Sequence, residues 1–311
     1  MKLNFITLSF FAALAFAACT KSESFTPKEA EILVQAGVAQ TRAGYEGTAI
    51  LPAKFVMDVE QNADSKYDYK NVVMVKDGDA YVPENSDNKM IWAGTAYNSV
   101  QVKSMTLPYG LTEVGPDMNV VVSENQTTEA EILKSDVLVA TKADGDIRIS
   151  GDMINIDFRH LLSKLEITYA YGSGLSESDV TINSMTLENI CTGGGYSYDT
   201  MGFQPSVSKT YGDVRMFSNT SSPKFEMIFF PYVPTENPKL VVNATISGET
   251  RQLSCPVAPK NSNGFEGGKR YTLKVTVNNS SITTGSISIS SGWEIDVDVK
   301  PELGDNIFIT D

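Results

Sequence analysis

Short stretches of alternating apolar and polar residues run through most of the chain, with turn residues between them. Residues 99–105 (SVQVKSM) and 180–187 (VTINSMTL) alternate at period two, which is typical of a strand with one buried face. Residues 71–75 precede KDGD and then AYV, a pattern that predicts a hairpin. The other predicted strands cover residues 31–38, 155–158, 225–230, 239–246, 271–277, 282–289 and 294–299.

Helical periodicity is rare by comparison. Residues 160–165 (HLLSKL) are the one helical candidate, as a single turn leading into a strand. Many short strands with so little helix predict an all-β protein built of β-sandwiches. The small, polar segment 172–178 (GSGLSES) divides the chain from residue 19 onward almost in half. We therefore expect two tandem sandwiches, at residues 29–172 and 173–311.

A leader sequence occupies the N-terminus. Lys2 precedes an apolar run that ends in FAAC, which predicts a signal peptide at residues 1–18 and a lipoprotein cleavage site before Cys19. The run is too short to span a membrane, which takes about 20 residues. We therefore expect export, a diacylglycerol group on Cys19 as the membrane contact, and a tether at residues 19–28.

The charge of the chain excludes one class of partner. Its formal net charge is −13, and loss of Lys2 with the leader would make it −14 (−13 − 1). Such an acidic surface repels phosphate backbones, so we expect no nucleic-acid partner.

Candidate catalytic and metal-binding residues are scarce. His160 is the single histidine, and its neighbours Asp157 and Lys164 do not form a recognisable catalytic set, so a role in bridging backbone groups at a strand edge is predicted. The DGD sequences at 77–79 and 144–146 lack the ligand spacing of a calcium loop and are predicted as solvated turns. We expect no enzyme activity, no cofactor and no metal site.

Besides Cys19 the chain contains two cysteines, Cys191 and Cys255. Their spacing leaves open whether they form a disulfide or stay as two buried thiols. Tyr196, Tyr198 and Tyr211 follow the glycine-rich residues 193–195 and are candidates for an exposed aromatic surface that stacks on sugars, although a loop that folds onto its own sandwich is the more common arrangement.

Four segments resemble, in their order, the fimbrillin family of Mfa-like lipoproteins, the subunits of type V pili. The segment DFRHLLSKL is similar to the F-x-H-x-L-x-K-L stretch of that family, and FEGGKRYTLKV is similar to its F-x-x-G-K-x-Y-x-L-x-V strand entry. SDVLVA is similar to a D-L-L-x-A segment, and TRA follows the first strand. The four lie at residues 41–43, 135–140, 157–165 and 265–275. With Cys19 and a late Trp293 they span most of the chain.

The resemblance implies two tandem transthyretin-like Greek-key β-sandwich domains and assembly by donor-strand exchange. In that scheme an arginine-specific protease removes the first strand, and a strand of the next subunit fills the open groove. Here residues 31–38 can be the removable strand, and the cut would fall between Arg42 and Ala43. Residues 306–310 are a candidate donor strand, whereas residues 294–299 are expected to stay in their own domain.

The implied function is that of a structural subunit of a cell-surface fimbria in cell adhesion, as a tip, accessory or stalk pilin. The implied partners are other fimbrillin subunits by strand exchange, outer-membrane lipid through Cys19, and a host or bacterial surface ligand. The expected location is the cell outer membrane, and the fimbrium after processing. The alternative is a surface glycan-binding lipoprotein of a polysaccharide-uptake system, which would need exposed aromatic side chains on one edge.

Overall fold

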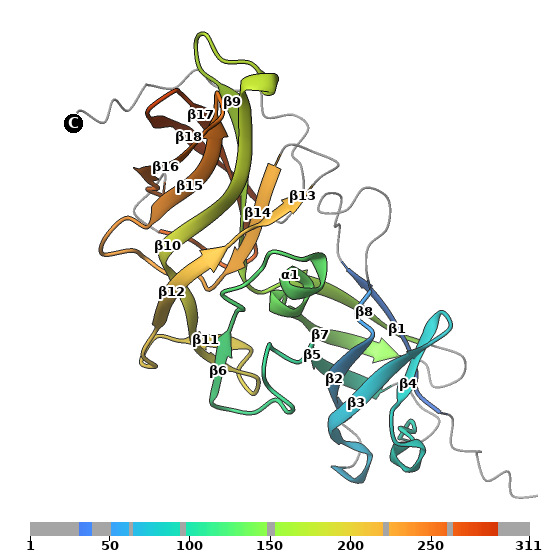
Figure 1. The fold of residues 1–311 in the computed structure, drawn as a ribbon. Coiled ribbons are helices and arrows are strands. Elements are labelled where there is room, and N and C mark those ends of the chain that lie inside the picture. The colour runs from blue at the N-terminus through green and yellow to red at the C-terminus, as the bar shows by residue number, and fades with distance from the viewer. Residues whose placement is uncertain are drawn as a thin grey trace, which may run out of the picture.

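The structure is a computed structural model that describes residues 31–38, 51–61, 65–93, 98–147, 153–219, 224–259 and 264–291. The predicted leader, Cys19, Arg42, Ala43, Trp293 and the candidate strands at 294–299 and 306–310 lie outside the described residues. Figure 1 shows two bodies of strands, one drawn mainly in blue and cyan and the other in yellow to red, with the helix α1 (Glu129–Ser135) between them.

The first body is a closed barrel. Its strands, in order around the barrel, are β1 (Leu33–Val38), β4 (Ala80–Pro83), β3 (Tyr69–Asp77), β2 (Lys54–Gln61), β5 (Asn98–Met105), β7 (Leu138–Ile147) and β8 (Met153–His160). Neighbours are antiparallel except β8 and β1, which run parallel. Alternate side chains point into a core that contains Phe55, Met57, Met74, Trp92 and Phe158, none more than 1% exposed.

The second body is a sandwich of two sheets. One sheet has the order β11 (Gly202–Gln204), β10 (Val180–Ser197), β15 (Lys239–Ile246), β16 (Glu249–Pro256), with β6 (Met118–Val121) and β12 (Thr210–Arg215) also paired to β10. The other has the order β13 (Phe217–Asn219), β14 (Lys224–Phe229), β9 (Ser163–Tyr171), β17 (Lys269–Val277), β18 (Ile282–Ser291). Their inner faces share one core, which includes Leu165, Leu187, Phe229, Leu240 and Tyr271.

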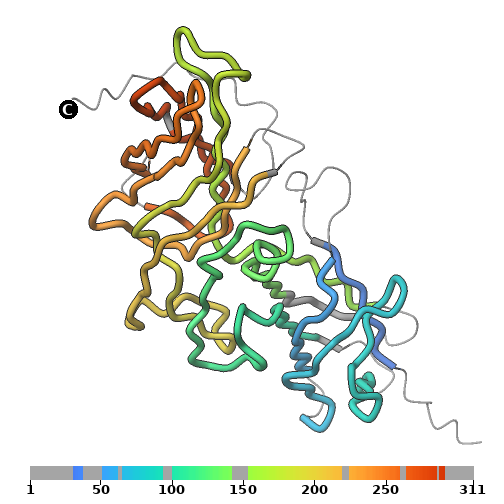
Figure 2. The backbone as a smooth tube through the Cα atoms, viewed as in Figure 1, coloured from blue at the N-terminus to red at the C-terminus, as the bar shows by residue number. Residues whose placement is uncertain are grey.

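The backbone passes between the two bodies more than once, as the tube in Figure 2 shows. It leaves the barrel after β5 to form β6, which pairs with β10, and returns through α1 to form β7 and β8. It leaves again as β9, which lies in the middle of the second sheet. The two bodies are therefore joined by several connections rather than by one linker.

Most of the strands predicted from alternation are confirmed. The predicted hairpin is β3 and β4, and Gly78 supplies the positive φ of 62° that its turn needs. The stretch predicted at residues 239–246 is β15, with the same limits. The all-β class is correct, while the transthyretin-like Greek-key connectivity stays a prediction.

The helical prediction at residues 160–165 is wrong. His160 ends β8 and Ser163 begins β9, whose backbone is paired on both sides by β14 and β17. These long-range hydrogen bonds override the local apolar spacing. The α-helix of the described residues is α1, and its start carries a signal in the sequence, because the Thr128 hydroxyl accepts a hydrogen bond from the Glu131 backbone N–H.

The prediction of a turn at residues 144–146 is also wrong. These residues continue β7, which pairs with β5 at Val100↔Asp144 and again at Asn98↔Ile147. The register shifts between the two pairs, so an irregularity in the ladder accommodates the Asp-Gly-Asp sequence without ending the strand.

The predicted boundary segment, residues 172–178, follows β9 directly. Because β9 pairs only with strands of the second body, the change from barrel to sandwich comes between β8 and β9. The domain limits at residues 172 and 173 stay a prediction.

Candidate functional site

The first strand occupies a distinctive place, because it closes the barrel. β1 lies between β4 and β8, and it runs parallel to β8 from Leu33↔Met153 to Val38↔Phe158. Its pairing with β4 is limited to a single position, Val34↔Tyr81. β1 is therefore held mainly along one edge and by the side chains that it places in the core.

The side chains of β1 and of the residue before it alternate between core and solvent. Ile32 and Val34 are 4% and 0% exposed, and Ala36 packs against the barrel core. Leu33, between them, is 48% exposed. This is the pattern of a strand that covers a core with one face.

The beginning of the strand is fixed by contacts to residues 89–91. The Ile32 backbone N–H donates to the Met90 carbonyl oxygen over 2.9 Å, and the backbone of Glu31 forms an isolated antiparallel β-bridge with that of Ile91. An ion pair joins Glu31 to Lys89 at 3.8 Å, but both side chains are exposed, so it contributes little.

Removal of β1 would leave two free strand edges with an apolar strip between them. Burying one aliphatic side chain such as Ile32 or Val34 contributes roughly 1.5–3 kcal/mol. The empty strip would therefore cost several kcal/mol, out of a typical domain stability of about 5–15 kcal/mol. An extended chain from another molecule could restore both the hydrogen bonds and the apolar contacts.

The covalent link that follows β1 runs from Val38 to Lys54, where β2 begins. In the barrel β2 lies between β3 and β5, so β1 and β2 are not neighbours. A cut between Arg42 and Ala43, which lie outside the described residues, would leave β1 attached to the barrel by noncovalent contacts alone.

The segments that resemble fimbrillins meet at the passage from β8 to β9. His160 Nδ1 lies 2.9 Å from Asp136 Oδ1, and the Leu161 N–H donates to the Val137 carbonyl oxygen over 2.8 Å. The predicted role of His160, bridging backbone groups, therefore needs correction at Nδ1, which lies beside a carboxylate. The contact between His160 and Asp136 lies at the end of β8, and it holds the residues just before β7 against that strand.

The segment at residues 265–275 meets the one at residues 157–165. β9 and β17 pair in parallel along their whole length, and the Gly268 N–H donates to the Leu162 carbonyl oxygen over 2.9 Å. Gly267 comes so close to Leu161 that an added Cβ would lie 2.5 Å from its carbonyl oxygen. Sequence reasoning missed this meeting point, since only the fold brings the segments together.

Charged side chains lie on the face of the β9–β17 sheet that is opposite the shared core, and several of them are buried there. Lys164 is 3% exposed and places its Nζ 3.1 Å from both Glu166 Oε1 and Glu226 Oε2. Opposite charges this close compensate part of the cost of burial. Lys164, the lysine of the family-like segment, is thus part of a buried ion-pair network, which the sequence around it did not reveal.

The two cysteines are separate thiols, on β10 and β16. Cys191 and Cys255 are both free and buried, which resolves the alternative that the sequence left open. Burial raises the pKa of each thiol to about 11, so both stay protonated at neutral pH.

Two of the three tyrosines considered for a sugar-binding surface are buried. Tyr196 and Tyr198 are each 1% exposed, and the Tyr198 hydroxyl donates to the Lys103 carbonyl oxygen of the barrel over 3.1 Å. Burial raises the pKa of Tyr196 to about 12. Tyr211 alone is exposed, at 49%, so these three residues do not form the candidate aromatic surface, and the glycan-binding alternative loses its main support.

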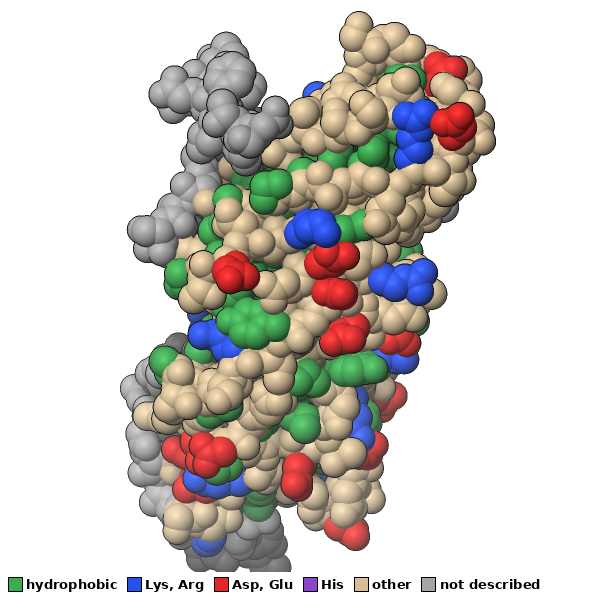
Figure 3. Space-filling view, turned by 60° about the vertical axis from the view of Figure 1, so that its left-hand side comes forward, with side chains coloured by type: hydrophobic (Ala, Val, Ile, Leu, Met, Phe, Trp, Pro, Cys, Tyr) green, Lys and Arg blue, Asp and Glu red, His purple; other side chains and the backbone are tan. Residues whose placement is uncertain are grey.

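The described residues contain no group of three or more His, Cys, Asp or Glu side chains arranged to hold a metal ion. Within the same ranges, no helix is long and apolar enough to cross a membrane. On the face shown in Figure 3, several acidic side chains follow one another down the middle, and basic side chains are scattered around them.

Comparison with known proteins identifies relatives of the whole fold. The sequence model of the family described as fimbrillin-like matches residues 41–293. A candidate cell adhesion protein from Bacteroides uniformis is 18% identical, with a TM-score of 0.64, over 86% of this chain and 99% of that one. A second, from Bacteroides ovatus, is 16% identical, with a TM-score of 0.61, over 86% and 99%. No curated protein matches the chain.

Proposed function

Because the chain belongs to the fimbrillin-like family, we propose that it is a structural subunit of a cell-surface fimbria that assembles by exchange of β1. Family membership supports the coarser statement, a pilus subunit or a protein of cell adhesion at the cell surface. The observation that carries the finer proposal is that one terminal strand closes the barrel and fills its core.

In the precursor, β1 keeps the barrel closed and prevents early association. Cleavage between Arg42 and Ala43 frees β1 from the chain that follows it. A strand of a neighbouring subunit then takes its place, with residues 306–310 as the candidate donor. The gain in free energy comes from a donor that fits the groove better than β1 or that is held beside it at high effective concentration.

The same proposal includes export as a lipoprotein. Cys19 carries the lipid and holds the precursor to the outer membrane, and cleavage after Arg42 releases the subunit into the fimbrium. The partners are other fimbrial subunits and, for a tip or accessory subunit, a ligand on a host or bacterial surface.

Mass spectrometry of the N-terminus of the protein from cells tests this proposal. We expect the precursor to begin at a diacylglycerol-modified Cys19 and the assembled protein to begin at Ala43. The variant Arg42→Ala should keep the Cys19 start and stay out of fimbriae. Arg159→Ala, which changes an exposed arginine on β8, should be processed like the natural protein. An assembled protein that still begins at Cys19, or normal processing of Arg42→Ala, would contradict the proposal.

A further inference from the structure

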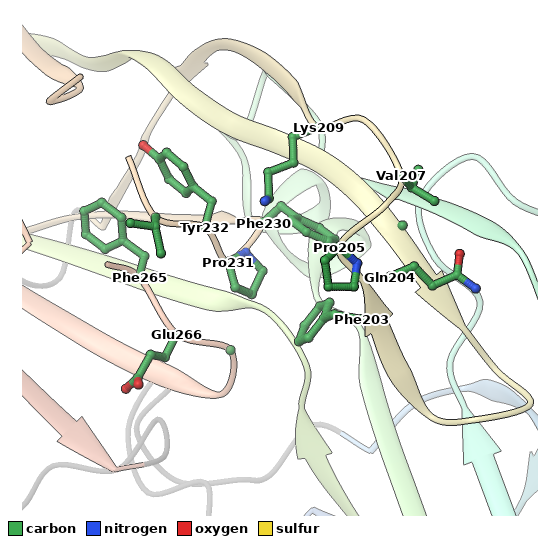
Figure 4. Close-up of a pocket in the computed structure, with 13 residues that line it drawn as sticks. Phe203, Gln204, Pro205, Val207, Lys209, Phe230, Pro231, Tyr232, Phe265 and Glu266 are labelled. Atoms are coloured by element: carbon green, nitrogen blue, oxygen red, sulfur yellow. The ribbon is translucent and has the colours of Figure 1, made fainter. Parts of the chain in front are cut away.

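A cavity of about 300 Å³ opens in the second body, between the end of β10 and the segment after β14. Its walls are mostly aromatic and proline side chains, which Figure 4 shows converging from separate parts of the chain: Phe203, Pro205, Phe230, Pro231, Tyr232 and Phe265. We call this cavity the aromatic pocket. Its volume lies at the lower end of the range for sites that take a small molecule or a single side chain.

The walls of the aromatic pocket are fixed. Tyr232 and Phe265 exchange backbone hydrogen bonds of 2.9 and 2.8 Å, and their rings stack with centroids 5.6 Å apart. Phe230 packs edge-to-face on Phe203 at 5.3 Å. Gly194 lies so close to Phe230 that an added Cβ would be 2.5 Å from its ring. The pocket therefore exists before any ligand arrives.

Exposed apolar side chains gather around the aromatic pocket. Phe203 and Val233 line it and are 40% and 60% exposed, and Tyr211, which packs against Tyr232, is 49% exposed. The other large apolar side chains exposed in the described ranges, Leu33, Val82 and Leu133, lie elsewhere. Apolar anchors gathered at one pocket are typical of a binding site.

One positive charge stands at the pocket. The exposed Lys209 side chain takes part in none of the ion pairs and hydrogen bonds found among the described residues, and Figure 4 shows its amino group directed toward the space between Tyr232 and Phe230. The carboxylate of Glu266 points away from these side chains. The pocket thus offers an apolar cavity with a cation beside it, which complements an apolar group next to a carboxylate.

Among the polar side chains that line the pocket, that of Gln204 is already engaged. The Gln204 amide donates to the Pro116 carbonyl oxygen at 2.9 Å and to Asp117 Oδ1 at 3.0 Å. A sugar would need several hydrogen-bonding groups, whereas most of the residues of this lining are apolar. β11, which carries Phe203, pairs with β10 alone among the described strands, so an extended chain can lie alongside it.

We propose that the aromatic pocket binds an extended peptide segment of a partner protein, taking one aromatic or branched apolar side chain while an adjacent carboxylate pairs with Lys209. This site is separate from the groove of β1 and stands whether or not β1 is exchanged.

Saturation-transfer NMR with the capped peptide Thr-Asp-Phe-Asp-Thr tests the proposal on the full chain. We expect saturation of the phenyl ring protons, and at least tenfold weaker binding to Lys209→Glu and to Val233→Glu. The matched variants Lys76→Glu and Val82→Glu place the same changes on exposed barrel residues and should bind like the natural protein. The peptide Thr-Lys-Phe-Lys-Thr should reverse the order and bind Lys209→Glu better than the natural protein.

The experiment with the lysine-containing peptide keeps the test decisive. A misfolded Lys209→Glu variant could lose binding to the aspartate peptide, but it could not gain binding to the lysine peptide. Absence of phenyl saturation in the natural protein would overturn the proposal. So would equal binding by the Lys209→Glu and Lys76→Glu variants, or saturation of N-acetylneuraminic acid in place of the peptide, which would indicate a sugar site.

Discussion

Replacing Val34 with aspartate is expected to destabilise the barrel by more than about 4 kcal/mol, because an apolar contact is lost and a carboxylate enters an apolar core. Val34 is fully buried, and it is the position at which β1 pairs with both β4 and β8. The change should appear in urea unfolding as a lower midpoint, and β1 should become accessible to protease.

Leu33→Asp is the matched control, because it places the same carboxylate on the neighbouring residue of the same strand. Leu33 is 48% exposed and points outward, so the free energy of unfolding should change by no more than about 0.5 kcal/mol. If the two variants unfold at the same urea concentration, Val34 does not lie in the barrel core with Leu33 on the opposite, exposed face of β1.

Replacing Gly267 with alanine is expected to lower stability by about 1–3 kcal/mol, as overpacking of a close contact does. The added Cβ would meet the carbonyl oxygen of Leu161 at 2.5 Å, and backbone cannot move aside as a side chain end can. The substitution should push apart residues 157–165 and 265–275, which meet where β9 pairs with β17. Hydrogen exchange at the Gly268 N–H should therefore become faster.

Gly115→Ala is the control for this effect. An added Cβ at Gly115 meets nothing within 4 Å, and its φ is outside the left-handed region. That variant should be neutral or slightly more stable, because alanine restricts the unfolded chain. A Gly267→Ala protein as stable as Gly115→Ala would mean that the meeting of the segments does not depend on this close approach.

Local patterns predicted the strands but not what they pair with. Runs of apolar residues located β15, and the KDGD turn sequence located the hairpin of β3 and β4, because both signals are local. Local signals failed at residues 160–165, where an apolar cluster reads as a helical turn until the pairing of β9 with β14 and β17 is known. The closure of the barrel by β1 is likewise a property of parallel, long-range pairing with β8.

The candidate site was predicted in part. The alternation of residues 31–38 indicated a strand with one apolar face, and Ile32 and Val34 do lie in the core. The seam between β4 and β8 could not be predicted, since β4 and β8 are about seventy residues apart in the sequence (83 to 153). The aromatic pocket was missed for the same reason, because Phe203, Phe230 and Phe265 come from three separate segments.

The central claim is that β1 is a replaceable strand, and exchange of a labelled copy tests it most directly. The chain is cut after Arg42, mixed with excess isotope-labelled peptide of residues 29–42, and followed by native mass spectrometry, with the uncut chain as control. We predict that the cut protein exchanges its own β1 for the labelled strand while the uncut chain takes up none. A cut protein that stays folded and incorporates no label, or an uncut chain that incorporates as much, would contradict the account.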